Sequence, residues 1–398
     1  MKKICFILPP LLPFPPSKGG AVETLLSLFI DENEKQRKYH ITVFSIYDDQ
    51  AKFLSKKYEY TDVIYIRLEN IALVKYKVCN VIQKTIGVRI KQLDDYNSYI
   101  LKYIKNNIDP DLCIVEGGYY REYINISKYI GPEKMAIHIH AVSTPRFNAN
   151  KIYKSFIFVS ECAKNVWQKK EICNSYVLTN AVDESKFNTT FDSNHQIKLR
   201  NSLGLDEKDF VILYCGRLIE IKGVLELLKA VNRINDNSVK LIIVGSSNFA
   251  EATVTDYQKE LLSQINNRIK FTGFIDNSKL PSYYKIADIV VTPSICQEAA
   301  SLVNIEAMMS GKAIITTSQG GNPEYVNSSG SIMIDYSGNK NKLIDQLYEN
   351  ILLMINNRIL VSKMAENNKI YAKSFTKQNY FENYSKIINF IISGEEKK

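Results

Sequence analysis

Residues 210–235 read FVILYCGRLIEIKGVLELLKAVNRIN, and residues 239–245 read VKLIIVG. An apolar run of strand length comes first, followed by a short loop, a helical pattern and a second apolar run. Strands that are hydrophobic almost throughout, rather than at alternate positions, are typical of parallel sheets covered by helices on both faces. The stretch therefore predicts a strand, a helix and a parallel strand, which is the repeating unit of an α/β sheet.

The same alternation extends over most of the 398 residues. Apolar runs of strand length recur in the first half, with helical patterns between several of them, such as AVETLLSLFIDENEKQ at 21–36. A polar stretch without steady periodicity covers 177–209, after which the pattern restarts. The chain is too long for one ordinary core, since domains usually hold about 50 to 200 residues. We expect two α/β domains in tandem.

The composition is that of a globular protein, with 45% hydrophobic and 23% charged residues. The seven cysteines are odd in number and lack CxxC spacing, which favours buried thiols in a reducing cytoplasm over a disulfide framework. The N-terminal MKKICFILPPLLPFPPSKGG is broken by prolines and favours a first strand and loop over a signal peptide. No stretch reaches the roughly 18 apolar residues that span a bilayer. We expect a cytoplasmic protein.

The formal net charge is +9, and one basic segment stands out. ALVKYKVCNVIQKTIGVRIK, at 72–91, contains lysines and an arginine but no acid. A basic amphipathic segment of this kind can lie on an anionic membrane surface, although an ordinary solvated helix face has the same pattern. Nucleic acid is not an expected partner, because no recognised binding module accompanies the charge.

The stretch EAASLVNIE begins at Glu298 and ends at Glu306, and it follows a strand-like run. Ser301 suits the N-cap of a helix over 302–310, which leaves Glu298 in the preceding loop and Glu306 in the second turn, roughly 8 Å from the helix start. Two carboxylates so spaced could hold opposite ends of a ligand, with the backbone N–H groups of 300–302 facing an anion. The alternative is a pair of surface acids near a helix start.

Two cations follow the strand at 210–215 and precede a helix. Arg217 and Lys222 therefore belong at the carboxyl edge of the sheet, where ligands of open α/β sheets bind. A guanidinium and an ammonium beside a helix N-terminus suit a diphosphate, although basic residues in such loops are often simply solvated. Their occurrence together with Glu298 and Glu306 favours a nucleotide ligand.

These residues resemble a known family. GRLIEIKG, FTGFIDNSKLPSYYKIADIVVTPS, the two glutamates and IEAMMSGKAIITTSQGGNPEYV are similar, in order and spacing, to the signature of the family-4 (GT4) retaining nucleotide-sugar glycosyltransferases of GT-B fold. The likeness covers about residues 205–330, and the first half fits more loosely. It implies two Rossmann-like parallel-sheet domains facing a central cleft. Residues 1–182 would form the acceptor-side domain, completed by a C-terminal helix at 376–398, and 183–375 the nucleotide-sugar domain.

The resemblance also implies roles for the donor-binding residues. Arg217 and Lys222 would bind the diphosphate and stabilise its charge as the glycosidic bond breaks. Glu306 would bind the ribose hydroxyls, and Glu298, a catalytic residue, would contact hydroxyls of the donor sugar. The remaining donor-binding positions in this half are Phe274, Ser301 and Leu302. Many family members carry Phe-Gly where this chain has Ala300 and Ser301, so the sugar pocket departs from the pattern.

In the first half, Gly19 and Gly20 would allow close approach to the phosphates, and His140 would act near the transferred sugar. No metal or cofactor is expected, since the nucleotide sugar is a substrate. UDP is the commonest nucleotide in such families. The resemblance implies transfer to a glycan or lipid-linked acceptor in surface polysaccharide synthesis. It does not discriminate between donor sugars or define an oligomeric state.

Other interpretations compete with a transferase. Asp109 and Asp111 form a D-x-D, a metal motif of another glycosyltransferase fold, but their place before a strand favours a structural turn. His138 and His140 share one strand face and could ligate a metal if further ligands converged. A glycosidase also uses two carboxylates but has no need of Arg217 and Lys222. A sugar-nucleotide epimerase of similar build and a non-catalytic sugar-nucleotide-binding protein remain open.

Overall fold

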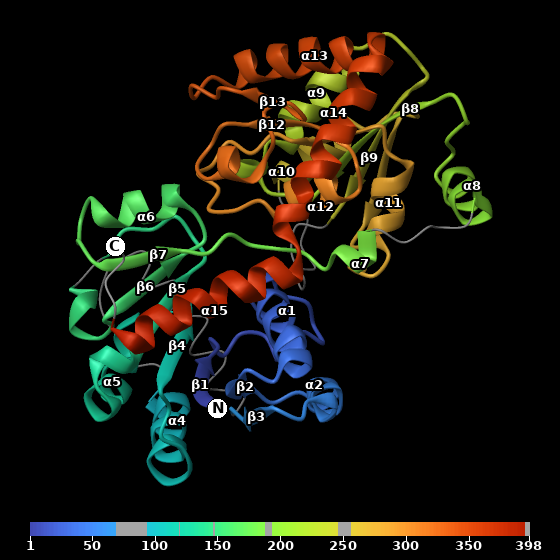
Figure 1. The fold of residues 1–398 in the computed structure, drawn as a ribbon. Coiled ribbons are helices and arrows are strands. Elements are labelled where there is room, and N and C mark those ends of the chain that lie inside the picture. Colours follow the sequence, from blue (N-terminus) through green and yellow to red (C-terminus); the bar gives the residue numbers. More distant parts are fainter. Residues whose placement is uncertain (69–93, 119, 146–147, 188–192, 246–255, 395–398) are drawn as a thin grey trace. The chain divides into compact units, whose positions relative to one another are not determined.

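The structure is a computed structural model that describes residues 1–68, 94–118, 120–145, 148–187, 193–245 and 256–394 (Figure 1). The chain divides into two compact units. Unit 1 comprises Met1–Thr179 and Lys377–Lys398, and unit 2 comprises Asn180–Thr376. Each unit is built on one parallel sheet with helices packed against it, so the two-domain α/β fold predicted from the sequence is confirmed.

Unit 1 contains a seven-stranded sheet in the order β3-β2-β1-β4-β5-β6-β7, and all of its strand pairs are parallel. The strands are β1 (Lys2–Ile7), β2 (Tyr39–Ile46), β3 (Thr61–Ile66), β4 (Leu112–Glu116), β5 (Met135–Ile139), β6 (Ser155–Phe158) and β7 (Asn174–Val177). The helices are α1 (Ala21–Gln36), α2 (Asp49–Leu54), α4 (Asp94–Asn107), α5 (Ile124–Ile130), α6 (Glu161–Gln168) and the C-terminal α15 (Lys377–Ser393).

Unit 2 contains a six-stranded parallel sheet in the order β10-β9-β8-β11-β12-β13. The strands are β8 (Phe210–Cys215), β9 (Val239–Val244), β10 (Ile269–Gly273), β11 (Ile289–Thr292), β12 (Ala313–Thr317) and β13 (Ser331–Ile334). The helices are α7 (Glu184–Phe187), α8 (Ser193–Ser202), α9 (Val224–Asn232), α10 (Asp256–Ser263), α11 (Leu280–Ile286), α12 (Leu302–Met309), α13 (Lys340–Asn356) and α14 (Arg358–Tyr371), with a short 3-10 turn, η5 (Glu220–Lys222), before α9.

The apolar run that begins unit 2 is buried on both faces of the sheet. In β8, Phe210, Ile212 and Tyr214 join the core beneath α9 and α13, whereas Val211 and Leu213 join the core beneath α11 and α12. This explains why the strand is hydrophobic at successive positions rather than at alternate ones. Polar side chains are thereby restricted to the ends of the strand.

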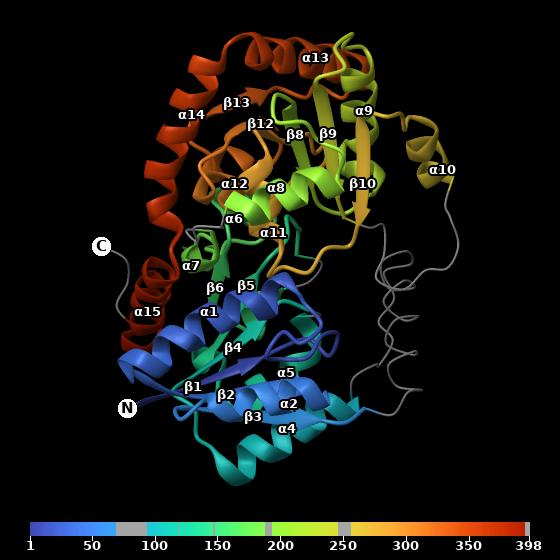
Figure 2. The same ribbon diagram turned by 90° about the vertical axis from the view of Figure 1, so that its right-hand side faces the viewer.

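The C-terminal helix α15 packs on α1 in unit 1 (Figure 2). Phe381 and Tyr384 lie against Phe29, with ring centroids 5.0 and 4.9 Å apart. The apolar stripe of the terminal sequence is therefore covered by the first helix of the chain. None of the helices in the described part of the chain is both long and apolar enough to cross a membrane.

Some features differ from the sequence-based expectations. The short strands β7 and β13 were not predicted, and the polar stretch at 177–209 contains α8.

The D-x-D forms the expected structural turn, because the carboxylate of Asp111 accepts a hydrogen bond from the backbone N–H of Lys3 at 2.7 Å. The basic segment at 72–91 lies outside the described residues.

Phe381→Ala should destabilise unit 1 by about 3 to 5 kcal/mol, because it removes a fully buried ring from the contact between α15 and α1. Urea unfolding followed by the fluorescence of Trp167, the single tryptophan of the chain and a core residue of unit 1, measures the change. Phe390→Ala on the same helix is the control, since Phe390 is 38% exposed. Equal effects of the two variants would contradict the assigned packing.

Candidate functional site

Each sheet has one point at which its strand order reverses. In unit 1 this point lies between β1 and β4, and in unit 2 between β8 and β11. Loops that leave neighbouring strands in opposite directions open a crevice at the carboxyl ends, which is where open α/β sheets bind ligands. Most of the predicted site residues follow these four strands or, in the case of His140, the adjacent β5.

In unit 2, the loops after β8 and β11 are held together by backbone contacts. Gly223 has a φ of +69°, and a Cβ at this position would lie 2.0 Å from the carbonyl oxygen of Pro293. The N–H of Ile295 also donates to the carbonyl of Ile221 at 3.0 Å. This close approach requires glycine at 223, and it fixes the position of the neighbouring Lys222.

Lys222 and Glu298 form an ion pair across the two loops, with Nζ 2.5 Å from Oε1. The hydroxyl of Ser294 donates to the same oxygen at 2.5 Å. The backbone of Glu298 is also fixed, because its carbonyl accepts from the N–H of Gly321 at 2.7 Å. The carboxylate is thus held by two side-chain donors and points at the loop that carries the cations.

Arg217 is exposed, and none of the ion pairs found in the described part of the chain includes it. Its backbone carbonyl accepts a hydrogen bond from the Tyr214 hydroxyl at 2.9 Å, which fixes the chain at this turn. One cation of the pair is therefore balanced by Glu298 and the other is not. This surplus of positive charge suits an anion such as a diphosphate.

Helix α12 begins where the sequence predicts, with Ser301 as its N-cap. The Ser301 hydroxyl accepts from the N–H of Asn304 at 3.3 Å, so the N–H groups of the first turn, including that of Leu302, are turned toward the loop end of the sheet. Glu306 lies in the second turn and accepts a hydrogen bond from the Tyr284 hydroxyl at 2.7 Å. Burial raises the pKa of Glu306 to about 7.

Phe274 follows Gly273 at the end of β10, two strands from β8 in the sheet. Its side chain is 59% exposed. An exposed aromatic ring at a carboxyl-end loop is compatible with contact to a base.

In unit 1, Gly19 and Gly20 form the turn between β1 and α1, with φ values of +75° and +113°. A Cβ at Gly20 would lie 2.0 Å from the carboxylate of Glu23 and 2.8 Å from Leu12 Cδ1, so a side chain there would require both of these side chains to move. Helix α1 begins directly afterwards, and its N-cap residue, Gly20, provides no side-chain cap. The carboxylate of Glu23 lies over this helix start and accepts from the backbone N–H of Glu23.

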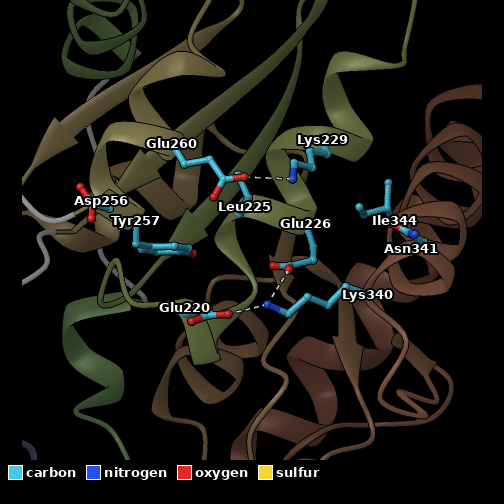
Figure 3. A pocket seen from close by; sticks show the side chains of 10 residues that line it. All are labelled: Glu220, Leu225, Glu226, Lys229, Asp256, Tyr257, Glu260, Lys340, Asn341 and Ile344. Carbon is cyan, nitrogen blue, oxygen red and sulfur yellow. Dashed lines mark hydrogen bonds and ion pairs between the residues drawn. The ribbon is translucent and has the colours of Figure 1, made fainter.

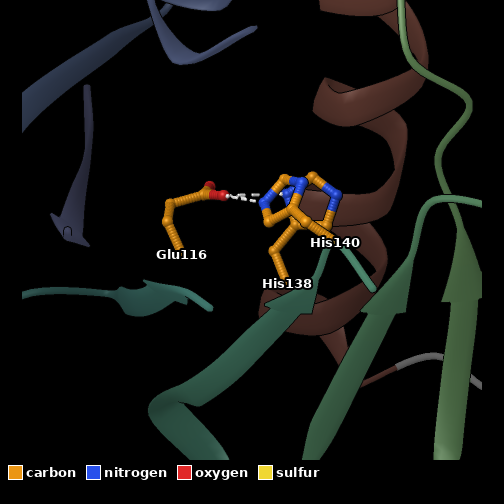
Figure 4. Close-up of side chains that lie close together, drawn as sticks. All are labelled: Glu116, His138 and His140. Carbon is orange, nitrogen blue, oxygen red and sulfur yellow. Dashed lines mark hydrogen bonds and ion pairs between the residues drawn. The ribbon is translucent and has the colours of Figure 1, made fainter. Parts of the chain in front are cut away.

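His140 follows β5 and belongs to a buried cluster with Glu116 and His138 (Figure 4). Glu116 Oε2 lies 2.8 Å from His140 Nε2 and 3.0 Å from His138 Nδ1. The Tyr384 hydroxyl of α15 donates to Glu116 Oε1 at 2.9 Å. Burial opposes ionisation of Glu116, but the two imidazoles outweigh it and hold the pKa of this carboxyl well below its usual range.

Glu116, His138 and His140 are also the one group of metal-ligand type found in the described part of the chain, with ligand atoms within 4.8 Å of one another. Both imidazole nitrogens lie at hydrogen-bond distance from the same carboxylate oxygen. Protons on the two nitrogens satisfy this arrangement without an ion. The expectation of a site that needs no metal stays a prediction.

A separate cavity of about 450 Å³ lies between α9, α10 and α13 in unit 2 (Figure 3). Lys340 bridges Glu220 and Glu226 there, at 2.6 and 3.7 Å, and Lys229 pairs with Glu260. The lining holds four acids and these two lysines, so its net formal charge is −2, which does not suit an anionic ligand. It contains none of the predicted site residues.

Sequence reasoning brought together Arg217, Lys222 and Glu298 but did not single out Glu116, Tyr284 or Tyr384. The signal for Glu116 was present in VEGG, where an acid ends an apolar strand and precedes two glycines. An acid at the carboxyl end of a central strand is more often functional than one on a solvated helix. Tyr384 carries no such local signal.

Comparisons with known proteins agree with the sheet topology and the loops described above. Residues 195–371 match the family model described as glycosyl transferases group 1. Lipopolysaccharide 1,2-N-acetylglucosaminetransferase of Salmonella typhimurium is 27% identical over 334 residues, 82% of this chain and 83% of that protein. Spore coat protein SA of Bacillus subtilis is 25% identical over 355 residues, 85% of this chain and 87% of its own.

Among solved structures, Anabaena HepE in complex with UDP-glucose superposes with a TM-score of 0.73 at 21% identity and covers 98% of this chain and 100% of its own. WaaG, a glycosyltransferase involved in lipopolysaccharide biosynthesis, superposes with a TM-score of 0.66 at 15% identity. The superposition covers 98% of this chain and 100% of WaaG. The two parallel-sheet units define a protein of GT-B fold. Within this fold, the match to the glycosyl transferases group 1 covers most of unit 2.

Glu306 should make the stability of unit 2 depend on pH. It ionises in the unfolded chain near its ordinary pKa of 4.5 but in the fold only near 7, so between these values the folded state binds more protons. The free energy of unfolding should fall as the pH rises from about 5 to 8. Glu306→Gln preserves the neutral form, so its free energy of unfolding should rise relative to that of the wild type by up to about 3 kcal/mol over this range.

Circular dichroism during urea unfolding, at pH 5, 6, 7 and 8, measures this difference. Glu349→Gln, at an exposed position of α13, is the control and should differ from the wild type by the same amount at each pH. A constant difference for Glu306→Gln would show that Glu306 ionises in the fold as it does in the unfolded chain.

Proposed function

We propose that the protein is a retaining glycosyltransferase that moves a sugar from a nucleotide-diphosphate donor, a UDP-sugar, to a glycan or lipid-linked acceptor in surface polysaccharide synthesis. The observation that carries the proposal is the group of Arg217, Lys222 and Glu298 at the point where the unit 2 strand order reverses. A neighbour of the same fold holds UDP-glucose, and a relative is named for lipopolysaccharide synthesis, which supports the donor and the pathway.

The chemistry follows from the charges. A diphosphate gains negative charge as the glycosidic C–O bond breaks, and fixed cations at that point stabilise the transition state more than the bound donor. Arg217, which is paired with no carboxylate in the described part of the chain, and Lys222 would take this role. No metal ion is expected to take part.

Glu298 would contact hydroxyls of the donor sugar rather than attack the sugar. Its Oε1 already accepts hydrogen bonds from Lys222 and Ser294, which lowers its nucleophilicity and leaves Oε2 for a ligand. Transfer with retention would then occur by attack of the acceptor on the face from which the diphosphate departs. The departing diphosphate can take up the proton that the attacking hydroxyl of the acceptor loses.

The other site residues would hold the donor along its length. The N–H groups at Ser301 and Leu302 would face the phosphates, Glu306 the ribose and the backbone at Phe274 the base. In unit 1, the turn at Gly19 and Gly20 would contact phosphate, and His140 would contact the transferred sugar.

The assay that tests the function measures nucleotide-diphosphate release from a panel of nucleotide sugars, selected by ligand-induced thermal shift, with and without acceptor. A transferase releases the nucleotide diphosphate only when an acceptor is present. An epimerase converts the sugar nucleotide and releases none, and a binding protein does neither. Either of the last two results would replace the proposal.

Arg217→Ala and Lys222→Ala should each lower kcat by about a hundred- to a thousandfold while changing donor affinity much less, since each cation acts most strongly in the transition state. Arg217→Lys should recover only part of the loss, because an ammonium cannot form the two parallel bonds of a guanidinium to phosphate. Arg233→Ala, an exposed arginine of unit 2 paired with Asp345, is the control. A loss confined to KM would mean that the cations only hold the donor.

We also propose that the protein meets the cytoplasmic face of an anionic membrane through 72–91, where a lipid-linked acceptor would be found. Neutralising Lys75, Lys77 and Lys84 should weaken binding to vesicles of anionic lipid, by on the order of 1 kcal/mol per lysine at low salt. Sedimentation with anionic and with neutral vesicles measures the effect. Unchanged binding after neutralisation would assign the segment to ordinary surface.

A further inference from the structure

The carboxylate of Glu116 is the acceptor for three side chains that come from three parts of unit 1. Glu116 ends β4 and lies directly opposite His138 of β5 in the sheet register. His140 follows β5, and Tyr384 comes from α15, 268 positions away in the sequence. Glu116 is 3% exposed and His138 fully buried, whereas the His140 side chain is 15% exposed. Of these three side chains, only that of His140 reaches the surface.

The contacts define which edge of the His140 ring faces the protein. Nε2 lies 2.8 Å from Glu116 Oε2, and the neighbouring Cδ2 lies beside Gly117, where a Cβ would be 3.9 Å away. The His138 ring packs against the His140 ring with centroids 4.0 Å apart. Three sides of the imidazole are therefore occupied, and the edge that carries Nδ1 is the one left for a ligand.

An ionised carboxylate only accepts hydrogen bonds, so each nitrogen that faces Glu116 must carry a proton. For His140 the proton is on Nε2. Burial, and next the adjacent His138, lower the pKa of His140, which favours a neutral ring with an unprotonated Nδ1. Glu116 thus selects one of the two tautomers of His140.

We propose that Glu116 is a positioning residue that holds His140 as the Nε2–H tautomer, so that Nδ1 accepts a hydrogen bond from a hydroxyl of the bound sugar. The sugar as ligand rests on the proposed function, whereas the tautomer does not. Because His140 accepts rather than donates, the site would favour a hydroxyl at this point of the sugar over an ether or a carbonyl.

Tyr384 completes the arrangement from the C-terminal helix. Burial, followed by the charge of Glu116, raises the pKa of Tyr384 well above its usual value, so the phenol stays protonated and donates to Glu116 Oε1. This bond fixes the carboxylate plane, and with it the direction of the bond to His140. Glu23, whose pKa burial and the charge of Glu116 raise to about 7, is the other acid near this carboxylate.

Long-range ¹H–¹⁵N correlation spectra of the imidazoles test the tautomer directly. The chain has four histidines, so loss of one signal set in His140→Ala assigns the residue. The wild type should show His140 protonated on Nε2 and unprotonated on Nδ1. Glu116→Leu removes the acceptor and should move the population toward the Nδ1–H tautomer, whereas Glu116→Gln can present either its oxygen or its N–H₂ to Nε2. Glu32→Gln, a buried glutamate of α1 paired with Lys35, is the control and should leave the spectrum unchanged.

Kinetics of the same variants test the consequence. Glu116→Leu should lower kcat about tenfold to a hundredfold with little change in donor KM, because His140 is present but misdirected. Tyr384→Phe keeps the carboxylate, should lower kcat less, and is informative if Glu116→Leu fails to fold. Glu32→Gln should retain wild-type kcat.

Several results would overturn the inference. These are a wild-type His140 protonated on Nδ1, a tautomer unchanged in folded Glu116→Leu, or a shifted tautomer with full kcat. Stoichiometric metal in the purified protein that Glu116→Gln loses would replace the hydrogen bonds by a metal centre. The spectra need no substrate, so they decide the tautomer even if no nucleotide sugar is turned over.

Discussion

A parallel sheet buried on both faces leaves the chain only its strand ends for charged groups. In β8 every side chain enters one of two cores, so the first polar positions are those of the loop that carries Arg217 and Lys222. The same holds in unit 1, where Glu116 is the last residue of β4. Because the strand order reverses beside β8 and beside β1, the loops on either side of each reversal leave in opposite directions and open a crevice at the carboxyl ends. The location of both clusters is thus a consequence of how the cores are filled.

Two carboxylates of the candidate sites, Glu116 and Glu306, show how hydrogen-bond partners and burial together set the charge. Glu116 accepts from two imidazoles and a phenol, and its pKa falls well below the usual range in spite of complete burial. Glu306 accepts from Tyr284 alone, and burial raises its pKa to about 7. Desolvation disfavours the ionised form of both Glu116 and Glu306, and only at Glu116 do the imidazoles reverse it. A catalytic role for His140 depends on this, since a protonated Glu116 could not select the tautomer.

The sequence predicted most of the sheet and the loops of unit 2, because long apolar runs and helical periodicity are local signals. It missed β7 and β13, each four residues long and at the edge of its sheet, where burial on one side leaves little apolar pattern. The sequence placed Lys222 and Glu298 at the same edge of the sheet, because each follows an apolar strand, but it did not predict their direct ion pair across 76 positions. Neither the local patterns nor the family resemblance predicted the hydrogen bond between Tyr384 and Glu116. A tyrosine in the apolar stripe of a helix is expected to be a core residue, and only the packing of α15 on α1 brings its hydroxyl to this carboxylate.

The two cations of unit 2 are not equivalent, although both follow β8. Lys222 is held by Glu298, so part of its charge is already balanced and its position is fixed before any ligand binds. Arg217 is exposed and unpaired with any carboxylate in the described part of the chain, so it keeps its full charge but also more of its conformational freedom. Preorganised charge stabilises a transition state most when no reorganisation is needed at the moment of reaction. Lys222 is preorganised in this way by its ion pair with Glu298 Oε1. In the proposed function, Glu298 would therefore contribute twice, because its Oε2 would remain for a sugar hydroxyl.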